Sequence, residues 1–403
     1  MQTSNTGTGF DVKRLSRIAD HLTSNYLDTG KIPGCQILVS RHGIPAYFES
    51  LGEMDRERQK PMREDTIFRI YSMTKPITSI ALMQLYEQGR FQLNDPVYRV
   101  IPEWKDQKVW LSGEGENMVC RNPESPMTFR HLLTHTSGIT YGATAHPVDK
   151  AYRVKGIRRD QGETLATFVK KLAEIPLRFD PGQRWLYSYS TDICGYLVEA
   201  LSGESLDNYL QKNIFDPLGM KDTAFHVAED KKDRFAANYR RNTDKTLTLI
   251  DDPEKSVYLE KKSFLSGGGG LVSTTRDYYR FCEMLRQNGY LDGERIIGPR
   301  TLRLMTRNHL KDGRDLKTMA IGDFSETPYE GIGFGLGFAM TLGQVVSGGY
   351  GEGDYYWGGA ASTIFWVDPV EDLIVIFMVQ LMPSATFNFR GQLKNLIYSS
   401  ITD

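Results

Sequence analysis

The spacing of apolar residues near the start of the chain predicts one helix followed by two strands. A helix is expected over residues 14–27, and a strand pair over 35–40 and 46–51 with a short turn between them. Pro33-Gly34 separates the helix from the strands. The apolar positions that define the helix are Leu15, Ile18, Leu22 and Tyr26.

The middle of the chain has helical spacing. Residues 66–88 form an approach segment and then a helix, with Gly89 where a C-terminal cap is expected. The polar stretch 229–262 has weak periodicity and is predicted to be a long, partly irregular excursion. Further helices are predicted over 128–134, 164–174, 191–201 and 205–214.

The last third returns to strands rich in aromatic and β-branched residues, predicted over 333–341, 355–367 and 372–379, before a final helix over 387–401. The predicted fold is therefore α/β, with residues 1–85 and 262–403 forming one discontinuous domain and 86–261 a mainly helical one. Hairpin-length links between strands favour antiparallel pairing.

The composition and net charge limit the classes of binding partner that are expected. The 403 residues are 40% hydrophobic and 25% charged with a formal net charge of -1, so neither nucleic acid nor an anionic membrane surface is an expected partner. Short basic clusters mixed with acids are expected on solvated faces or loops. They include Arg158, Arg159, Lys231 and Lys232.

The N-terminal residues are polar and lack the apolar core of a secretory signal, which favours a cytoplasmic protein. The longest apolar run, residues 373–379, is too short to cross a bilayer and is predicted to be a buried strand. The cysteines are widely spaced and expected to be reduced: Cys35, Cys120, Cys194 and Cys282. No metal or cofactor is expected, and a homo-oligomer is compatible with the sequence.

Ser72-Met73-Thr74-Lys75 is the first candidate for chemistry. On a helix, residues three apart share a face, so the lysine amine would lie beside the serine hydroxyl. The positive field of the helix N-terminus and burial both disfavour a charged ammonium, which lets the amine accept the serine proton. Alone, the pattern also fits a helix start with Ser72 as N-cap.

Two further segments could supply the rest of a site. Tyr187 and Tyr189 lie on a loop before a predicted helix, where a tyrosine can transfer protons or simply fill a loop core. Trp357-Gly358-Gly359-Ala360 lies on a predicted strand, where glycines allow close approach to the backbone. A free N–H there could be an oxyanion donor; a bulge is the alternative.

Taken in this order, the three segments resemble the superfamily of class C β-lactamases, DD-peptidases and family VIII carboxylesterases. The resemblance covers nearly the whole chain. Other matching segments are Ile32-Pro33-Gly34, His131-Leu132-Leu133-Thr134-His135-Thr136-Ser137-Gly138, Gly267-Gly268-Gly269-Gly270-Leu271-Val272-Ser273-Thr274 and Phe365-Trp366-Val367-Asp368-Pro369.

The resemblance implies a β-lactamase-like antiparallel sheet flanked by helices. It also implies Ser72 as nucleophile, Lys75 as its activating partner and Tyr187 as the proton-transfer residue, with Tyr189 as a rival. The backbone N–H groups of Ser72 and Ala360 would form the oxyanion hole. The expected substrate-binding residues are Trp357, Gly358, Gly359, Tyr356, Tyr141 and Tyr189.

The sequence departs from the β-lactamase pattern at two positions, and the second departure, Trp357-Gly358-Gly359, resembles the esterase branch. Tyr189 stands where the β-lactamases usually have asparagine, and Trp357 stands where they have the lysine of K-T-G. The charge that would meet a β-lactam carboxylate is thus absent at that position. The expected reaction is cleavage of short- to medium-chain carboxylic esters through an acyl-enzyme. The expected partner is therefore a small-molecule ester substrate.

Other signals are interpreted as structural. His131 and His135 are four apart, but Leu132 replaces the glutamate of H-E-x-x-H. The run 267–270 lacks the lysine of a phosphate-binding loop and predicts a close backbone crossing near the site. No G-x-S-x-G is present, which argues against an α/β-hydrolase.

Several alternatives stay open. The same residues could serve a β-lactamase, a D-amino-acid peptidase or amidase, or an acyltransferase. A binding protein that keeps the fold without catalysis is a second class. A purely structural role for all three segments is a third.

Overall fold

The computed structural model describes residues 1–4, 6–159, 162–322 and 327–403. Its centre is an eight-stranded sheet in the order β12-β13-β14-β15-β16-β1-β2-β3, and every neighbouring pair in it is antiparallel. The strands of this sheet are β1 (Gly34–Arg41), β2 (Ile44–Asp55), β3 (Lys60–Pro61), β12 (Ile332–Phe334), β13 (Ala339–Thr341), β14 (Tyr355–Gly358), β15 (Ile364–Asp368) and β16 (Leu373–Val379).

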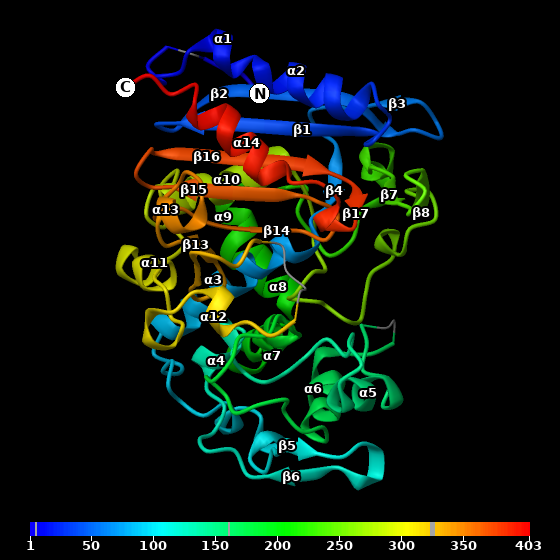
Figure 1. The fold of residues 1–403 in the computed structure, drawn as a ribbon, viewed down its shortest axis with the longest axis vertical. Helices are drawn as coiled ribbons and strands as arrows, with labels where there is room; N and C mark the ends of the chain where they lie inside the picture. The colour runs from blue at the N-terminus through cyan, green and yellow to red at the C-terminus, as the bar shows by residue number, and fades with distance from the viewer. Residues whose placement is uncertain (5, 160–161, 323–326) are drawn as a thin grey trace.

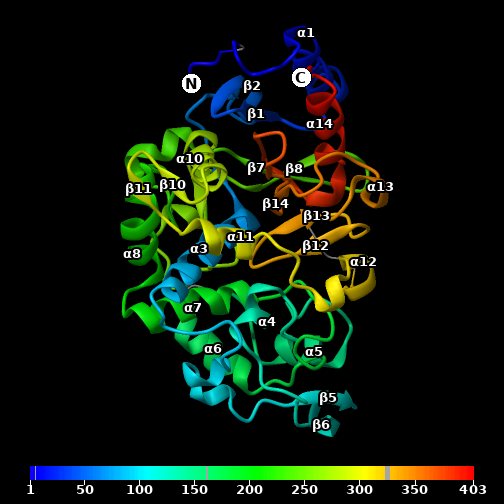
Figure 2. The same ribbon diagram turned by 90° about the vertical axis from the view of Figure 1, so that its left-hand side faces the viewer.

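Helices cover both faces of this sheet, and further helices lie in the lower half of the molecule above a strand pair at its lower end (Figure 1). Figure 2 shows α10 and α14 on opposite sides of the strands. The helices are α1 (Val12–Leu15), α2 (Arg17–Leu22), α3 (Thr74–Glu87), α4 (Phe129–Leu133), α5 (Pro147–Val154), α6 (Leu165–Ala173), α7 (Ser190–Ser202), α8 (Leu206–Leu210), α9 (Asp216–Leu218), α10 (Thr275–Arg286), α11 (Pro299–Met305), α12 (Leu316–Met319), α13 (Gln344–Ser347) and α14 (Phe389–Tyr398).

The two ends of the chain share the central sheet. Every residue of β1 and of β16 is buried, and the two strands pair from Cys35 opposite Val379 to Arg41 opposite Leu373. A strand that is covered on both faces has apolar residues at successive positions. Residues 373–379 therefore show no alternation of apolar and polar residues. The predicted α/β fold with an antiparallel sheet is confirmed.

Smaller strand pairs complete the fold. The predicted irregular excursion over 229–262 instead contains a hairpin that joins the upper part of the molecule, because β7 pairs in parallel with β17. The alternation of apolar and polar residues in these two strands is short, so the sequence pattern did not predict the hairpin. The remaining strands are β4 (Ile67–Arg69), β5 (Val109–Ser112), β6 (Val119–Arg121), β7 (Asn238–Arg241), β8 (Leu247–Asp251), β9 (Val272–Thr274), β10 (Tyr290–Leu291), β11 (Glu294–Arg295) and β17 (Leu381–Met382).

Two predicted strands are each a hairpin. The expected strand 355–367 is divided into β14 and β15 by a turn in which Ser362 has a φ of 67°, and 333–341 is divided into β12 and β13 around Gly337, with a φ of 94°. Left-handed backbone cannot continue a strand. The first of these turns carries Ala360 to the candidate site.

Helix α10 was not predicted from the sequence, because polar residues interrupt its apolar spacing. Asp277 and Glu283 are both buried in it, and Thr274 caps its start by accepting from the Asp277 N–H. The predicted helix over 14–27 is present as α1, α2 and a π-helical turn, Thr23–Leu27. Among the described residues, no helix combines the length and the apolar composition that a membrane crossing requires.

Candidate active site

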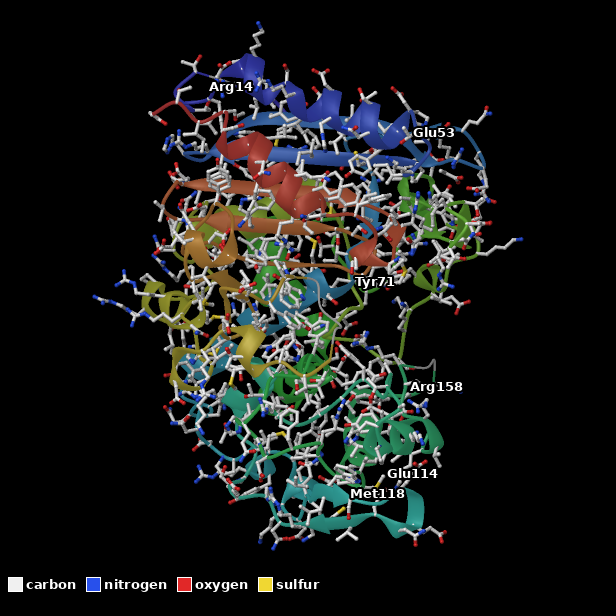
Figure 3. All side chains as sticks on the ribbon, viewed as in Figure 1. Arg14, Glu53, Tyr71, Glu114, Met118 and Arg158 are labelled. Atoms are coloured by element: carbon white, nitrogen blue, oxygen red, sulfur yellow. The ribbon has the colours of Figure 1, made fainter. Side chains whose placement is uncertain are left out.

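Ser72 and Lys75 lie together where the sheet meets the helical region. Ser72 belongs to a 3₁₀ turn, Tyr71–Met73, that leads directly into α3. The Lys75 Nζ donates to Ser72 Oγ over 3.2 Å, and the lysine side chain is only 2% exposed. Figure 3 shows the labelled Tyr71 at the junction of the two parts. The S-x-x-K spacing thus places the amine beside the hydroxyl.

The backbone just before the nucleophile candidate is strained. Tyr71 has a φ of 42°, an unfavourable left-handed conformation for a residue with a side chain. Its hydroxyl accepts a hydrogen bond of 2.9 Å from Asn238 Nδ2 of β7, and the Met73 N–H donates to the Ile70 carbonyl. The hairpin missed in the sequence therefore helps to hold the turn that presents Ser72.

A second partner fixes the Lys75 amine. Lys75 Nζ donates to the Gly268 carbonyl over 2.6 Å, and the Gly268 N–H donates to Asp192 Oδ1 over 3.2 Å. A Cβ on Gly267 would lie 2.8 Å from the Thr191 carbonyl, and one on Gly268 would lie 2.5 Å from Asp192 Oδ2. The glycine run is the close backbone crossing that the sequence predicted.

Asp192 links this crossing to Arg159. The carboxylate is fully buried and accepts from Ser266 Oγ over 2.6 Å and from Arg159 Nη2 over 2.8 Å. Arg159 lies in a loop and is exposed, as predicted, but its side chain, 32% exposed, is paired with Asp192. Sequence reasoning missed both residues, although an acid at the start of an apolar helix is a signal for a buried partner.

Tyr187 is the tyrosine that reaches the Ser72–Lys75 pair. Its ring centroid lies 4.5 Å from Lys75 Nζ, and its hydroxyl accepts a hydrogen bond of 3.0 Å from Trp357 Nε1. That indole N–H stabilises negative charge on the Tyr187 oxygen. Tyr189 packs instead between Tyr141 and Phe168, at centroid distances of 4.7 and 5.1 Å.

A cavity of about 250 Å³ opens beside Ser72; we term it the nucleophile cavity. Ser72 and Tyr187 lie in its wall, together with Arg159. The apolar part of its wall is formed by Tyr141, Ala143, Leu186, Ile321 and Ala360. The structure thus brings Tyr141 and Ala360, two of the candidate residues, to the cavity.

The other predicted binding residues lie behind the wall. Trp357 is fully buried and contacts the site through its hydrogen bond to Tyr187. Tyr356 is on the opposite face of β14, where its ring lies 4.1 Å from the Arg390 guanidinium. Gly358 ends β14, and the Gly359 N–H donates to the Thr363 carbonyl over 2.7 Å. These residues shape the hairpin and do not line the nucleophile cavity.

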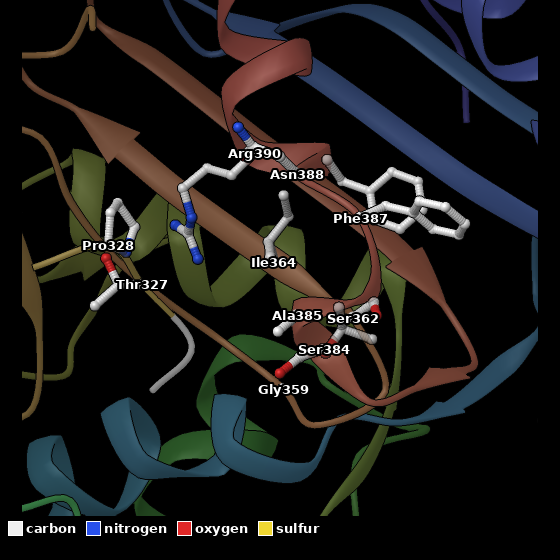
Figure 4. A pocket seen from close by; sticks show the side chains of 12 residues that line it. Thr327, Pro328, Gly359, Ser362, Ile364, Ser384, Ala385, Phe387, Asn388 and Arg390 are labelled. Carbon is white, nitrogen blue, oxygen red and sulfur yellow. The ribbon is translucent and has the colours of Figure 1, made fainter. Parts of the chain in front are cut away.

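A further cavity, of about 340 Å³, lies on the far side of the same turn (Figure 4). Gly359 and Ser362 line it, together with Arg390 from α14. The turn between β14 and β15 therefore separates two hollows, with Ala360 facing one and Gly359 facing the other.

The two histidines have packing and capping roles. His131 forms a capping box with Thr128 at the start of α4. His135 is enclosed by Trp185, Tyr187 and Phe334, and burial, aided by the nearby Lys75 amine, holds the pKa of His135 well below its usual range. His135 is therefore neutral at pH 7. All four cysteines are free thiols, and only Cys120 is exposed.

Fold and site together define a class: a mixed α/β protein with a serine and a lysine one helical turn apart at the head of a helix, below an antiparallel sheet. The model of the family described as Beta-lactamase matches residues 19–398. The chain belongs to this family.

Named relatives are esterases and acyltransferases. Esterase EstB from Burkholderia gladioli is 31% identical over 395 residues, which cover 93% of this chain and 92% of the relative. Among solved structures, EstCE1, described as a hydrolase with promiscuous acyltransferase activity, superposes with a TM-score of 0.79 at 27% identity over 96% of this chain and 98% of its own. Simvastatin synthase (LovD) from Aspergillus terreus superposes with a TM-score of 0.80 at 25% identity over 96% and 98% of the two chains.

Proposed function

We propose that this chain is a serine esterase that cleaves short- to medium-chain carboxylic esters through an acyl-enzyme on Ser72. The observation that carries the proposal is the contact between Lys75 Nζ and Ser72 Oγ at the wall of a largely apolar cavity. The esterases among the relatives support the same reaction class.

Acylation begins with loss of the Ser72 proton. The Lys75–Tyr187 pair accepts this proton while Oγ forms a bond to the ester carbonyl carbon. The carbonyl oxygen becomes an oxyanion, for which the N–H groups of Ser72 and Ala360 are the proposed donors. The tetrahedral intermediate then collapses. The bond to the alcohol oxygen breaks, and the alkoxide takes the proton from the Lys75–Tyr187 pair.

Deacylation repeats these steps with water. The Lys75–Tyr187 pair accepts a proton from water, the hydroxide attacks the acyl carbonyl, and Ser72 leaves with that proton as the acid departs. The Gly268 carbonyl and the Tyr187 ring both stabilise a cationic amine, so Lys75 can hold the proton between the two steps. The titration of two such close groups belongs to the pair.

The first experiment measures p-nitrophenolate release from p-nitrophenyl butyrate by the wild type and by Ser72→Ala. Turnover in the wild type that Ser72→Ala abolishes would support the proposal, and equal rates in the two proteins would overturn the role of Ser72. Ser79→Ala is the matched control. Ser79 is buried two turns further along α3, and its hydroxyl has no hydrogen-bond partner among the described residues.

Acyl transfer to an alcohol is a second candidate, favoured by the apolar wall of the nucleophile cavity and by the acyltransferases among the relatives. An apolar site holds an organic alcohol better than water. Adding benzyl alcohol to the butyrate assay and measuring benzyl butyrate against butyric acid distinguishes the two reactions. A product that is mainly the new ester would favour the acyltransferase.

A β-lactamase is less well supported, because Trp357 is fully buried and offers no cation at the position of the family lysine. We expect nitrocefin turnover far below that of the butyrate ester. Comparable turnover of both substrates would contradict this expectation.

A further inference from the structure

A second hollow adjoins the nucleophile cavity. It has a volume of about 440 Å³, and we term it the cationic cavity. Tyr71, Arg159 and Gly269 line both hollows, so they share a wall immediately beside Ser72. The cationic cavity is completed by Tyr258, Lys262 and Phe264. The two cavities are therefore direct neighbours, separated by these three residues.

Lys262 is the unmatched charge of this cavity. The side chain is half-buried, with Nζ 3.4 Å from the Tyr258 ring centroid. In the described part of the chain, no carboxylate oxygen lies within 4.0 Å of this amine. Burial, reinforced by Arg69 and Arg159 and opposed by Asp251, lowers the pKa of Lys262 to about 8. The ammonium is therefore destabilised by its surroundings.

The neighbouring charges are already balanced in pairs. Arg69 donates to Asp251 over 2.6 Å, and Arg159 donates to Asp192 over 2.8 Å. Counting the described residues of this group, three cations thus face two carboxylates, and the excess is the single charge of Lys262. One bound carboxylate would balance the cavity, whereas a dianionic phosphate would leave it negative.

We propose that the cationic cavity binds a carboxylate carried by the ester substrate, with Lys262 as its ion-pair partner and Arg159 as the wall that the substrate passes. The inference rests on the proposed esterase function and deepens it: the preferred substrates are esters with a free acid group, such as half-esters of dicarboxylic acids. Trp357, which stands where the family has a lysine, lies on β14. The Lys262 charge therefore comes from a different side of the site.

The test compares a neutral ester, p-nitrophenyl butyrate, with an anionic one, mono-p-nitrophenyl glutarate. A third ester, 4-carboxyphenyl butyrate, carries the charge on the alcohol side. In Lys262→Met, we expect kcat/KM for at least one anionic ester to fall about tenfold relative to the neutral ester, the effect of one charge-assisted hydrogen bond. The anionic ester that responds shows which side of the substrate enters the cavity.

Two variants control for folding and for net charge. Lys261→Met removes the same charge one residue away, on an exposed side chain outside this cavity, and should leave the ratio unchanged. Lys262→Arg should restore the preference. An unchanged ratio for both anionic esters in Lys262→Met, or an equal drop in Lys261→Met, would overturn the proposal.

Direct binding separates this proposal from the esterase proposal. If the wild type hydrolyses none of the three esters, the esterase function fails, and titration calorimetry with glutarate still tests the cavity. Saturable glutarate binding by the wild type that is weakened about tenfold in Lys262→Met would support the carboxylate site. No saturable binding by the wild type would overturn it.

Discussion

The two adjoining cavities differ in how their polar groups are held. In the nucleophile cavity, the Lys75 amine has a hydroxyl and a backbone carbonyl as partners, within 3.2 and 2.6 Å. In the cationic cavity, Lys262 belongs to an irregular segment after β8 and its amine lies over an aromatic ring, with no carboxylate of the described residues within 4.0 Å.

This difference matches the two proposed roles: proton transfer by Lys75 and ligand binding by Lys262. A group that must move a proton repeatedly has to be held in one place, which the glycine crossing does for Lys75. A group that binds a ligand, in contrast, needs hydrogen-bond donors that are not already used within the protein. The variants below disturb one cavity each, except Asp192→Asn, which affects both.

The largest effect is expected from Lys75→Met, which removes the amine and keeps most of its volume. Without a proton acceptor beside Ser72, kcat/KM for p-nitrophenyl butyrate should fall by about 10³-fold or more. Lys394→Met is the matched control, because Lys394 is also a buried lysine but is paired with Asp354 behind the sheet. It should lose stability and keep its kcat. A Lys75→Met enzyme within tenfold of the wild type would contradict the mechanism.

Asp192→Asn should disturb both cavities, because Asp192 bonds the Gly268 N–H and Arg159 at once. Removing a buried charge that accepts several hydrogen bonds should lower the free energy of unfolding by about 2–3 kcal/mol. Urea denaturation measures this loss, and kcat should fall as well since Gly268 holds Lys75.

Asp180→Asn separates the two effects of Asp192→Asn. Asp180 is also buried and bonds Arg121 and the Glu124 N–H, away from either cavity. It should lose comparable stability without loss of kcat. Equal activity in the two variants would show that Asp192 does not position Lys75.

Trp357→Phe should have a moderate effect confined to the nucleophile cavity. It removes the N–H that the Tyr187 hydroxyl accepts, and kcat should fall about tenfold, the value of one such hydrogen bond. The pH profile of kcat should also move, which a loss of packing alone would not cause. Trp366→Phe, equally buried on β15, should leave both kcat and its pH profile unchanged.

The smallest effect is a pH dependence of substrate preference. Because the pKa of Lys262 is lowered to about 8, its amine is charged below that pH and neutral above it. The preference of the wild type for the anionic ester should therefore be full near pH 7 and fall several-fold as pH rises through 8. Lys262→Met should show no such fall. If the wild-type preference for the anionic ester does not change across this pH range, Lys262 is not the group that binds the substrate carboxylate.

The sequence predicted the nucleophile cavity better than the cationic one for a physical reason. Ser72 and Lys75 are three residues apart on one element, so their contact follows from helix geometry alone. Tyr187 came from the resemblance of its loop to a family, and the structure places it beside Lys75. Its role as a proton carrier stays a prediction.

Arg159 and Lys262 could not be predicted in this way. Each lies in an irregular segment, where no periodicity shows which face a side chain takes. Their meeting at one cavity depends on how the segment after β8 folds back over Tyr71, which is a long-range contact. The sheet was predictable from its apolar runs, whereas the turn that carries Ala360 was hidden inside one continuous apolar segment.

The place of β1 in the sheet also has a consequence for biosynthesis. It pairs with β2, made immediately after it, and with β16, made more than 300 residues later. A nascent chain therefore exposes one apolar edge of the β1–β2 hairpin until β16 has left the ribosome. Premature termination before β16 should give an aggregating product rather than a smaller working enzyme, and expression at low temperature with chaperones should raise the yield.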